Sequence, residues 1–152
     1  MSSPHLALAA NRPIGAYAAT VLRKYDWPPV CLLLAESPSD DNSAGDIQEI
    51  FPDVPLQIGR EFRERTGIAF LGELELDLIL CVHFPYLLPP EVLSIPSKGC
   101  LNLHPAYLPW NRGWHTPSWA ILEDTPGGAT LHWTDIPHIN FGYEVRRPPC
   151  DE

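Results

Sequence analysis

The sequence predicts an α/β fold of the Rossmann-like, doubly wound class, in which helices cover both faces of a mostly parallel sheet. Six short apolar runs alternate with five helical stretches along the 152 residues, and this alternation is typical of parallel sheets. Two of the runs, VCLLLA at 30–35 and LDLILCV at 76–82, are apolar at nearly every position, as in strands that are covered on both sides. The length suits one domain with a sizeable core.

The first half of the chain is expected to supply three strands and three helices. The strands are expected over residues 6–10, 30–35 and 54–58, and the helices over 14–25, 44–51 and 60–71. Pro13 suits the first turn of the first helix, where its missing N–H costs nothing. Arg23 and Lys24 near the end of that helix complement its dipole.

The second half continues the alternation, with strands expected over residues 76–82, 100–104 and 129–133 and helices over 91–95 and 116–123. Thr116 is expected to cap the last helix, with Pro117 at its first helical position, and Trp119 is expected to lie in the core. Ligands of such sheets sit beyond the carboxyl ends of the strands. The rule directs attention to residues 83–90, residues 102–115 and the segment after the last strand.

The composition narrows the possible partners. The chain has 10 Lys and Arg against 19 Asp and Glu, a formal net charge of −9, which disfavours binding to nucleic-acid phosphates. No run approaches the roughly 20 apolar residues of a membrane span, and the N-terminus lacks the basic region of a signal peptide. A cytoplasmic protein with no nucleic-acid or membrane partner is expected. The 18 prolines are interpreted as turns and loop stiffeners.

Four cysteines are widely spread and form no C-x-x-C pair, so they are expected to be buried, reduced thiols. The cysteine and histidine side chains of the second half are possible metal ligands by residue type. Their spacings match no standard zinc pattern, and no metal is expected. These residues are Cys100, His104, His115, His132 and His138.

Asn102 and His104 are the residues to which the sequence points most directly. They lie two apart on an expected strand, so both side chains point to the same face, and Pro105 ends the strand directly after them. An imidazole can move a proton near neutral pH. An amide can donate a hydrogen bond to a carbonyl oxygen that gains negative charge. The pair therefore suits acyl transfer, while a core histidine beside a turn asparagine is the alternative.

Residues 77–135 resemble the folate-dependent formyltransferases, which act on methionyl-tRNA, glycinamide ribonucleotide or amino sugars. The resemblance rests on an Asn-x-His-Pro strand end, a Leu-Pro, an Arg-Gly and a Gly-x-Thr strand, in that order. In this chain these are Asn102 to Pro105, Leu108-Pro109, Arg112-Gly113 and Gly128 to Thr130. The segment PAYLPWNRGWHTPSWAI is most similar to the sugar N-formyltransferases.

The resemblance implies a function and a set of site residues. A formyl group would pass from 10-formyltetrahydrofolate to the amine of a nucleotide-linked amino sugar. His104 would take part in proton transfer and Asn102 would hold the formyl oxygen. The donor would lie against Phe84, Pro85, Tyr86, Leu87, Leu88 and Asp135, with the family's contacts made largely by backbone. The substrate contacts are expected at Trp110, Arg112, Trp114 and His115.

The sequence departs from the family pattern toward its end. The third catalytic position of the family is an aspartate two residues before a glycine, and here Asn140 precedes Gly142 at that spacing. An asparagine can hydrogen-bond an imidazole but cannot balance the charge of an imidazolium. Asp135 is a second possible carboxylate partner. Impaired activity is therefore expected, and the alternative function is a catalytically silent, folate-binding module.

The resemblance to the formyltransferases also implies a domain organisation. Residues 1–135 are expected to form a formyltransferase-like domain and residues 136–152 an atypical, irregular tail, as in a truncated or frame-altered form of the family. The family continues with further strands and helices beyond this point. An unpaired sheet edge invites a partner strand, so a homo-oligomer is compatible with the sequence.

Overall fold

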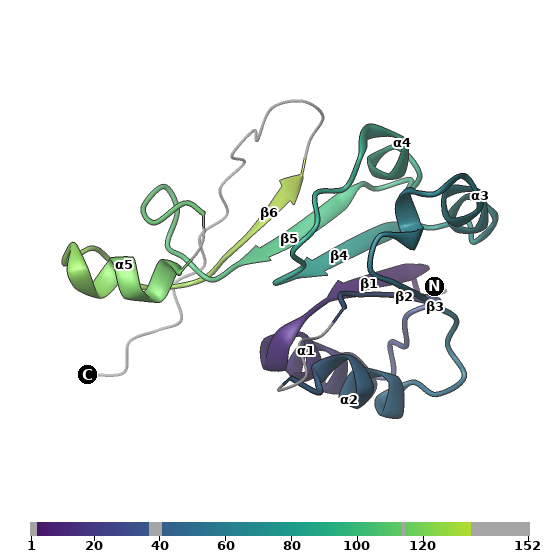
Figure 1. The fold of residues 1–152 in the computed structure, drawn as a ribbon, viewed down its shortest axis with the longest axis horizontal. Helices are drawn as coiled ribbons and strands as arrows, with labels where there is room; N and C mark the ends of the chain where they lie inside the picture. Colours follow the sequence, from purple (N-terminus) through teal and green to yellow (C-terminus); the bar gives the residue numbers. More distant parts are fainter. Residues whose placement is uncertain (1–2, 37–40, 114, 135–152) are drawn as a thin grey trace.

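The computed structural model describes residues 3–36, 41–113 and 115–134, and within them a six-stranded sheet (Figure 1). The strand order is β3-β2-β1-β4-β5-β6; the first five strands are parallel, and β6 runs antiparallel to β5. The predicted doubly wound α/β fold is confirmed. The strands are β1 (Leu6–Ala10), β2 (Cys31–Leu34), β3 (Leu56–Ile58), β4 (Leu78–Val82), β5 (Cys100–His104) and β6 (Thr130–Thr134).

Helices flank the sheet on both sides. In Figure 1, α1 (Arg12–Lys24) and α2 (Ser43–Ile50) lie on one side, and α3 (Arg65–Glu73) and α4 (Pro90–Leu93) lie on the other. The alternation of side chains along a strand divides the core accordingly. Leu6 and Leu8 of β1 pack on the α1 and α2 side, whereas Ala7 and Ala9 pack on the α3 and α4 side.

Small residues allow the first helix to lie close to the sheet. A Cβ added at Gly15 of α1 would lie 3.0 Å from the Cβ of Ala10 at the end of β1. The helix begins at Arg12, two residues before the expected start, with Pro13 in its first turn and Arg23 and Lys24 in its last, as the sequence predicts.

The prediction of a helix over residues 60–71 is wrong for the first half of that range. Residues Glu61–Arg63 form one 3-10 turn, Glu64 is extended with φ −73° and ψ 153°, and α3 begins only at Arg65. Gly67 permits this break, because a Cβ there would lie 2.0 Å from the Glu61 carbonyl oxygen. The Gln57 amide donates to the Gly67 carbonyl at 3.1 Å and holds the start of α3 against the preceding segment.

The last helix, α5 (Thr116–Leu122), differs from expectation in two ways. Thr116 is its first residue rather than its cap: His115 holds the N-cap position, and the Thr116 hydroxyl donates to the Pro105 carbonyl instead. Trp119 is 48% exposed rather than in the core. Figure 1 shows the reason, since α5 projects beyond the end of the sheet instead of lying on it.

Three of the four cysteines lie in the described residues, and the prediction of buried, reduced thiols is confirmed for them. Cys31, Cys81 and Cys100 are free and buried in strands. Burial raises the pKa of Cys31 and of Cys100 to about 12 and raises that of Cys81 as well. These thiols are therefore protonated and unreactive at neutral pH.

Two other expectations concern the tail of the chain and a membrane-spanning helix. The expected tail, residues 136–152, lies outside the described residues, as does Cys150. Across residues 3–36, 41–113 and 115–134, no helix is long and apolar enough to span a bilayer.

Candidate active site

The carboxyl end of β5 presents Asn102 and His104 on one face of the sheet. Cys100, two residues earlier on the strand, packs in the core beneath α3 and α4, and the period of a strand places Asn102 and His104 on that same side. Both side chains are partly buried. The structure therefore brings the two residues together as the spacing predicts, at the edge where parallel sheets hold their ligands.

Asn102 has a partner that the sequence analysis did not identify as part of the site. In the antiparallel register of β5 and β6, Asn102 lies opposite His132, and its side-chain amide lies 3.0 Å from His132 Nε2. His132 Nδ1 lies 3.0 Å from the Trp133 carbonyl oxygen. One neutral form of His132 satisfies both contacts: Nδ1–H donates to the carbonyl, and bare Nε2 accepts from the Asn102 amide. His132 therefore orients the amide of Asn102.

His104 is held by the loop that follows it. Its Nε2 lies 3.3 Å from the backbone carbonyl oxygen of Asn111, and its ring centroid lies 6.5 Å from that of His132. Burial lowers the pKa of His104 below its ordinary value of 6.5, and the neighbouring His132 and His83 lower it further, while the bond to the Asn111 carbonyl opposes the shift. The imidazole is therefore neutral at pH 7 and able to accept a proton.

Thr130 fastens the same loop to the sheet. Its hydroxyl donates to the Ala106 carbonyl at 2.7 Å and accepts from the Leu108 amide at 3.2 Å. Thr130 is only 1% exposed and lies opposite His104 in the strand register. The backbone directly after His104 is consequently fixed by a buried side chain of the neighbouring strand.

Residues 84–88, the expected donor-binding segment, follow β4 on the same side of the sheet as Asn102 and His104. Phe84 and Tyr86 pack inward against Phe62, with ring centroids 5.6 and 6.1 Å from its ring. Arg63 donates a hydrogen bond of 2.6 Å to the Leu87 carbonyl, while the Leu87 side chain is 85% exposed. The segment is therefore anchored by its aromatic side chains and by one arginine.

The backbone of this segment has bonding capacity left over. Within the described part of the chain, no backbone N–H of residues 84–88 donates to another backbone group. A pterin ring carries both donors and acceptors along one edge, and an extended backbone can match them. These residues thus fit the folate-type donor that the family resemblance implies.

The expected substrate contacts lie between β5 and α5. Trp110 stacks on Tyr107 with centroids 5.6 Å apart, Arg112 is exposed, and His115 is exposed at the start of α5 with φ 56°. Trp114, expected to join them, lies outside the described residues, as do Asp135 and Asn140. The structure thus places three of the four residues in one loop.

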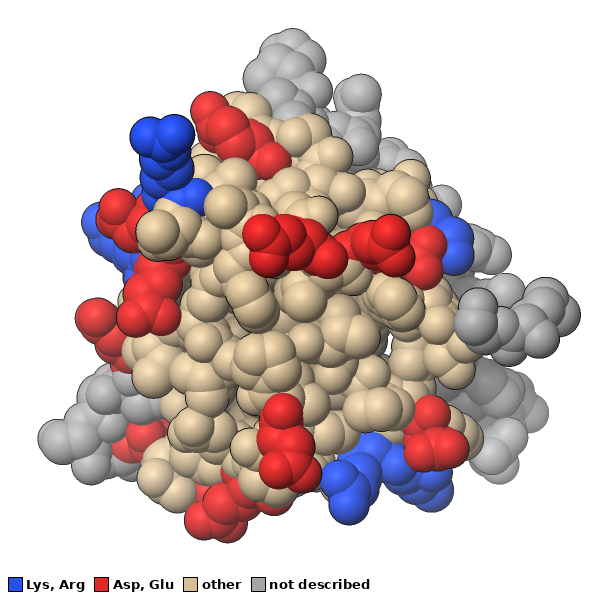
Figure 2. Space-filling model, turned by 90° about the vertical axis from the view of Figure 1, so that its right-hand side faces the viewer, with Lys and Arg blue, Asp and Glu red and all other residues tan. Residues whose placement is uncertain are grey.

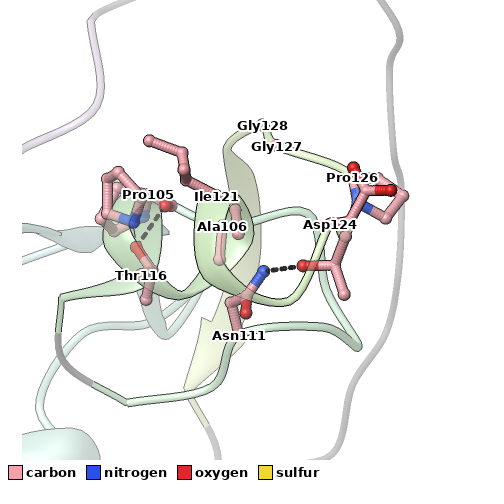
Figure 3. A pocket seen from close by; sticks show the side chains of 12 residues that line it. Pro105, Ala106, Asn111, Thr116, Ile121, Asp124, Pro126, Gly127 and Gly128 are labelled. Atoms are coloured by element: carbon pink, nitrogen blue, oxygen red, sulfur yellow. Dashed lines mark hydrogen bonds between the residues drawn. The ribbon is translucent and has the colours of Figure 1, made fainter.

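A cavity of about 550 Å³ lies beside this loop, between the end of β5, α5 and the segment leading to β6 (Figure 3). Trp110, Arg112 and His115 do not line it. Its polar wall includes Asn111, Thr116 and Thr125, and the Asn111 amide donates to the Thr125 hydroxyl at 2.7 Å. The remaining lining residues are Pro105, Ala106, Pro117, Ala120, Ile121, Asp124, Pro126, Gly127 and Gly128.

No group of three or more histidine, cysteine or acidic side chains is placed to hold a metal ion, as far as the described residues extend.

Three residues of the site were missed at the level of sequence: Asn111, Thr130 and His132. The alternation of Thr130 and His132 in a short strand was a usable signal, because it places both side chains on one face. Nothing in the sequence gives the register that sets His132 opposite Asn102. For Asn111 the contact is made by a backbone carbonyl, which no residue type reveals.

The topology defines a doubly wound α/β domain, and the polar pair lies at the carboxyl edge of the sheet, where folds of this class bind their ligands. The chain belongs to the formyl transferase family, whose profile matches residues 36–137. This match begins well upstream of residue 77, where the resemblance noted from the motifs begins.

Curated relatives with similar sequences are methionyl-tRNA formyltransferases. That of Clostridium beijerinckii is 43% identical over 70 residues, which cover 45% of this chain and 23% of the relative. That of Geotalea daltonii is 42% identical over 84 residues, or 55% of this chain and 27% of the relative. The matched part thus spans about a quarter of each relative.

Solved formyltransferases share the fold. Phosphoribosylglycinamide formyltransferase from Streptococcus pneumoniae superposes with a TM-score of 0.70 at 19% identity, covering 98% of this chain and 86% of that protein. A sugar N-formyltransferase from a Shewanella species gives a TM-score of 0.62 at 21% identity, covering 88% and 52%. At these identities the likeness concerns the fold.

Proposed function

We propose that this chain transfers a formyl group from 10-formyltetrahydrofolate to the amine of a nucleotide-linked amino sugar. The observation that carries the proposal is the pair of Asn102 and His104 on one face at the carboxyl end of β5. Residues 84–88 lie on the same side of the sheet, and their backbone N–H groups make no backbone hydrogen bond in the described part of the chain. Residues 1–135 are proposed to form the formyltransferase unit.

The two site residues divide the work. The folate donor supplies the one-carbon acyl group. Asn102 uses one amide N–H for His132 and keeps the other for the formyl oxygen, where negative charge develops as the amine attacks. His104 donates through Nε2 to the Asn111 carbonyl, which leaves Nδ1 as the nitrogen that accepts the proton released by the attacking amine. The bond between the formyl carbon and the folate nitrogen then breaks, and His104 returns the proton to that nitrogen as tetrahydrofolate leaves.

Several side chains fix residues 84–88, the segment proposed to bind the donor. Phe84 and Tyr86 pack against Phe62, and Arg63 donates a hydrogen bond to the Leu87 carbonyl. The exposed Leu87 side chain offers apolar surface for a ring. With Pro85 and Leu88, these residues form the proposed donor site, to which Asp135 is added from the sequence pattern.

The proposed acceptor of the formyl group is an amino sugar. It is supported by the run from Pro105 to Ile121, which resembles sugar N-formyltransferases, and by the aromatic and basic side chains Trp110, Trp114, Arg112 and His115 after the site strand. The net charge of −9 is unfavourable for a tRNA. Figure 2 shows the end of the molecule away from α5, where lysine and arginine side chains lie at the rim, interspersed with acidic ones, and form no continuous basic surface.

A folate-binding module without transfer activity is the second candidate. The observation that favours it is Asn140 at the position where the family carries an aspartate. Replacing Asn140 by Asp distinguishes the two candidate functions. An impaired formyltransferase gains turnover, whereas a silent folate-binding module gains none.

Two measurements test the proposal. Calorimetric titration with a stable 10-formylfolate analogue is expected to show binding by the full chain and by Asn102→Ala, and an absence of heat at high protein concentration contradicts the donor site. A formyl-transfer assay then compares 4-amino sugar nucleotides, glycinamide ribonucleotide and methionyl-tRNA. Transfer to the sugar nucleotides, abolished by His104→Ala, supports the proposal. Binding without transfer to any of the three identifies the silent module.

A further inference from the structure

We infer that Asn111 is a positioning residue that fixes the tautomer and orientation of His104 through its backbone carbonyl, and that Thr125 holds Asn111 in place. The functional meaning of this inference rests on the proposed function, whereas the geometry does not. Three hydrogen bonds carry it, and they run from the site strand through the following loop to the end of α5.

The first bond is between His104 Nε2 and the Asn111 carbonyl oxygen, at 3.3 Å. A carbonyl only accepts, so Nε2 must carry the hydrogen. Nδ1 is then the bare nitrogen of neutral His104. The second nitrogen of a histidine is commonly set in this way by the hydrogen bond that the first one makes.

The second bond joins the Asn111 side chain to Thr125. Asn111 Nδ2 donates to Thr125 Oγ1 at 2.7 Å, which Figure 3 draws as a dashed line. Asn111 Oδ1 is buried and has no hydrogen-bond partner in the described part of the chain, so the hydroxyl is the anchor of this amide there. Asn111 has φ 56°, a left-handed conformation that asparagine tolerates better than most residues.

The third bond fixes Thr125 itself, whose backbone N–H donates to the Ala120 carbonyl of α5 at 3.0 Å. The loop after α5 is thereby connected to the imidazole at the end of β5. The route runs alongside the cavity of about 550 Å³, which both Asn111 and Thr125 line.

Three groups act on the charge of His104. His132 of β6 and His83 after β4 lower its pKa along with burial, and only the bond to the Asn111 carbonyl raises it. Loss of that bond is therefore expected to lower the pKa further and to free the ring to exchange tautomers. A purely structural role for Asn111 would change neither property in a protein that stays folded.

The test uses ¹⁵N-histidine-labelled full chain, with the imidazole signals of His104 assigned by comparison with His104→Gln. In the wild type, His104 is expected as the Nε2–H tautomer. In Thr125→Val, which keeps the shape of the side chain but removes the hydroxyl, a mixture of tautomers and a lower titration midpoint are expected. Thr125→Ser restores the hydroxyl and is expected to restore both properties.

The matched control is Thr20→Val, which removes an exposed hydroxyl that donates to the Ala16 carbonyl in α1 and is expected to leave the His104 signals unchanged. If Thr125→Val does not fold, Asn111→Gly takes its place, because glycine accepts the positive φ and lacks the amide. An Nδ1–H tautomer in the wild type overturns the inference. So does an unaltered tautomer and midpoint in a folded variant.

The labelling experiment needs neither folate nor substrate, so its outcome is separate from that of the proposed function. Where transfer is measurable, Thr125→Val is expected to lower kcat by about tenfold, the rate equivalent of one hydrogen bond, with the KM for the donor unchanged. A chain that transfers no formyl group refutes the proposed function and leaves the positioning of His104 to be decided by the spectra.

Discussion

Asn102 and His132 lie opposite each other on antiparallel strands, and the Asn102 amide donates to His132 Nε2 at 3.0 Å. His132 is 9% exposed and makes its other bond to the Trp133 carbonyl. The partner is thus a buried imidazole whose neutral form accepts from the amide, and it sets the direction in which the second amide N–H points.

Replacing His132 is expected to reduce formyl transfer more than donor binding. In His132→Ala the Asn102 amide loses its acceptor and is free to rotate, so kcat should fall by about tenfold, as for the loss of one orienting hydrogen bond. The control is Leu131→Ala, which alters the neighbouring, half-exposed position on the opposite face of β6. Equal rates for the two variants would show that His132 has no such role.

Arg63→Gln is expected to weaken binding of a 10-formylfolate analogue. Its guanidinium donates to the Leu87 carbonyl at 2.6 Å, and without that bond the segment 84–88 loses a fixed point. One hydrogen bond from a charged donor corresponds to about a tenfold rise in Kd, measurable by calorimetry. Arg65→Gln on the exposed side of α3 is the matched control, and a similar Kd for both variants would contradict the anchoring role.

Gly67 and Gly72 of α3 should respond oppositely to alanine. A Cβ at Gly67 would lie 2.0 Å from the Glu61 carbonyl oxygen, whereas one at Gly72 has nothing within 4 Å. Gly67→Ala should lower the free energy of unfolding by about 3 kcal/mol through overpacking. Gly72→Ala should raise it by about 0.5–1 kcal/mol through helix propensity. Denaturant unfolding of both variants measures the difference, and a stable Gly67→Ala would refute the contact.

Asp77 is expected to make folding stability depend on acid pH. It accepts from the His5 backbone N–H at 3.0 Å and from the Ser97 hydroxyl at 3.0 Å, and it pairs with Lys98 at 3.3 Å. The His5 bond, the Ser97 bond and then Lys98 hold the pKa of Asp77 below its ordinary value of 3.8. The stabilisation is therefore fully present above that value and is lost as the pH falls through the folded pKa.

Asp77→Asn removes this acid dependence in part and destabilises the fold at neutral pH, where the charged carboxylate is the better acceptor. Unfolding curves between pH 2 and pH 7 provide the measurement, with the exposed Asp53→Asn as the comparison. Parallel pH curves for wild type and Asp77→Asn would contradict the expectation.

The class of fold and the shared face of Asn102 and His104 could both be predicted from local patterns of residues. Strand and helix periods are local properties, so six apolar runs and five helical stretches were enough to predict a doubly wound sheet, and the spacing of Asn102 and His104 was enough to place them on one face. The motif order from residue 77 onward was enough to predict the family.

Contacts between segments far apart in the chain could not be predicted in this way. The break before α3 brings Gly67 against the Glu61 carbonyl, and Trp119 is exposed because α5 extends past the sheet. The contacts of Asn102 with His132 and of His104 with the Asn111 carbonyl depend on strand register and on loop closure. Those follow from how the whole chain packs, and no local period of the sequence contains them.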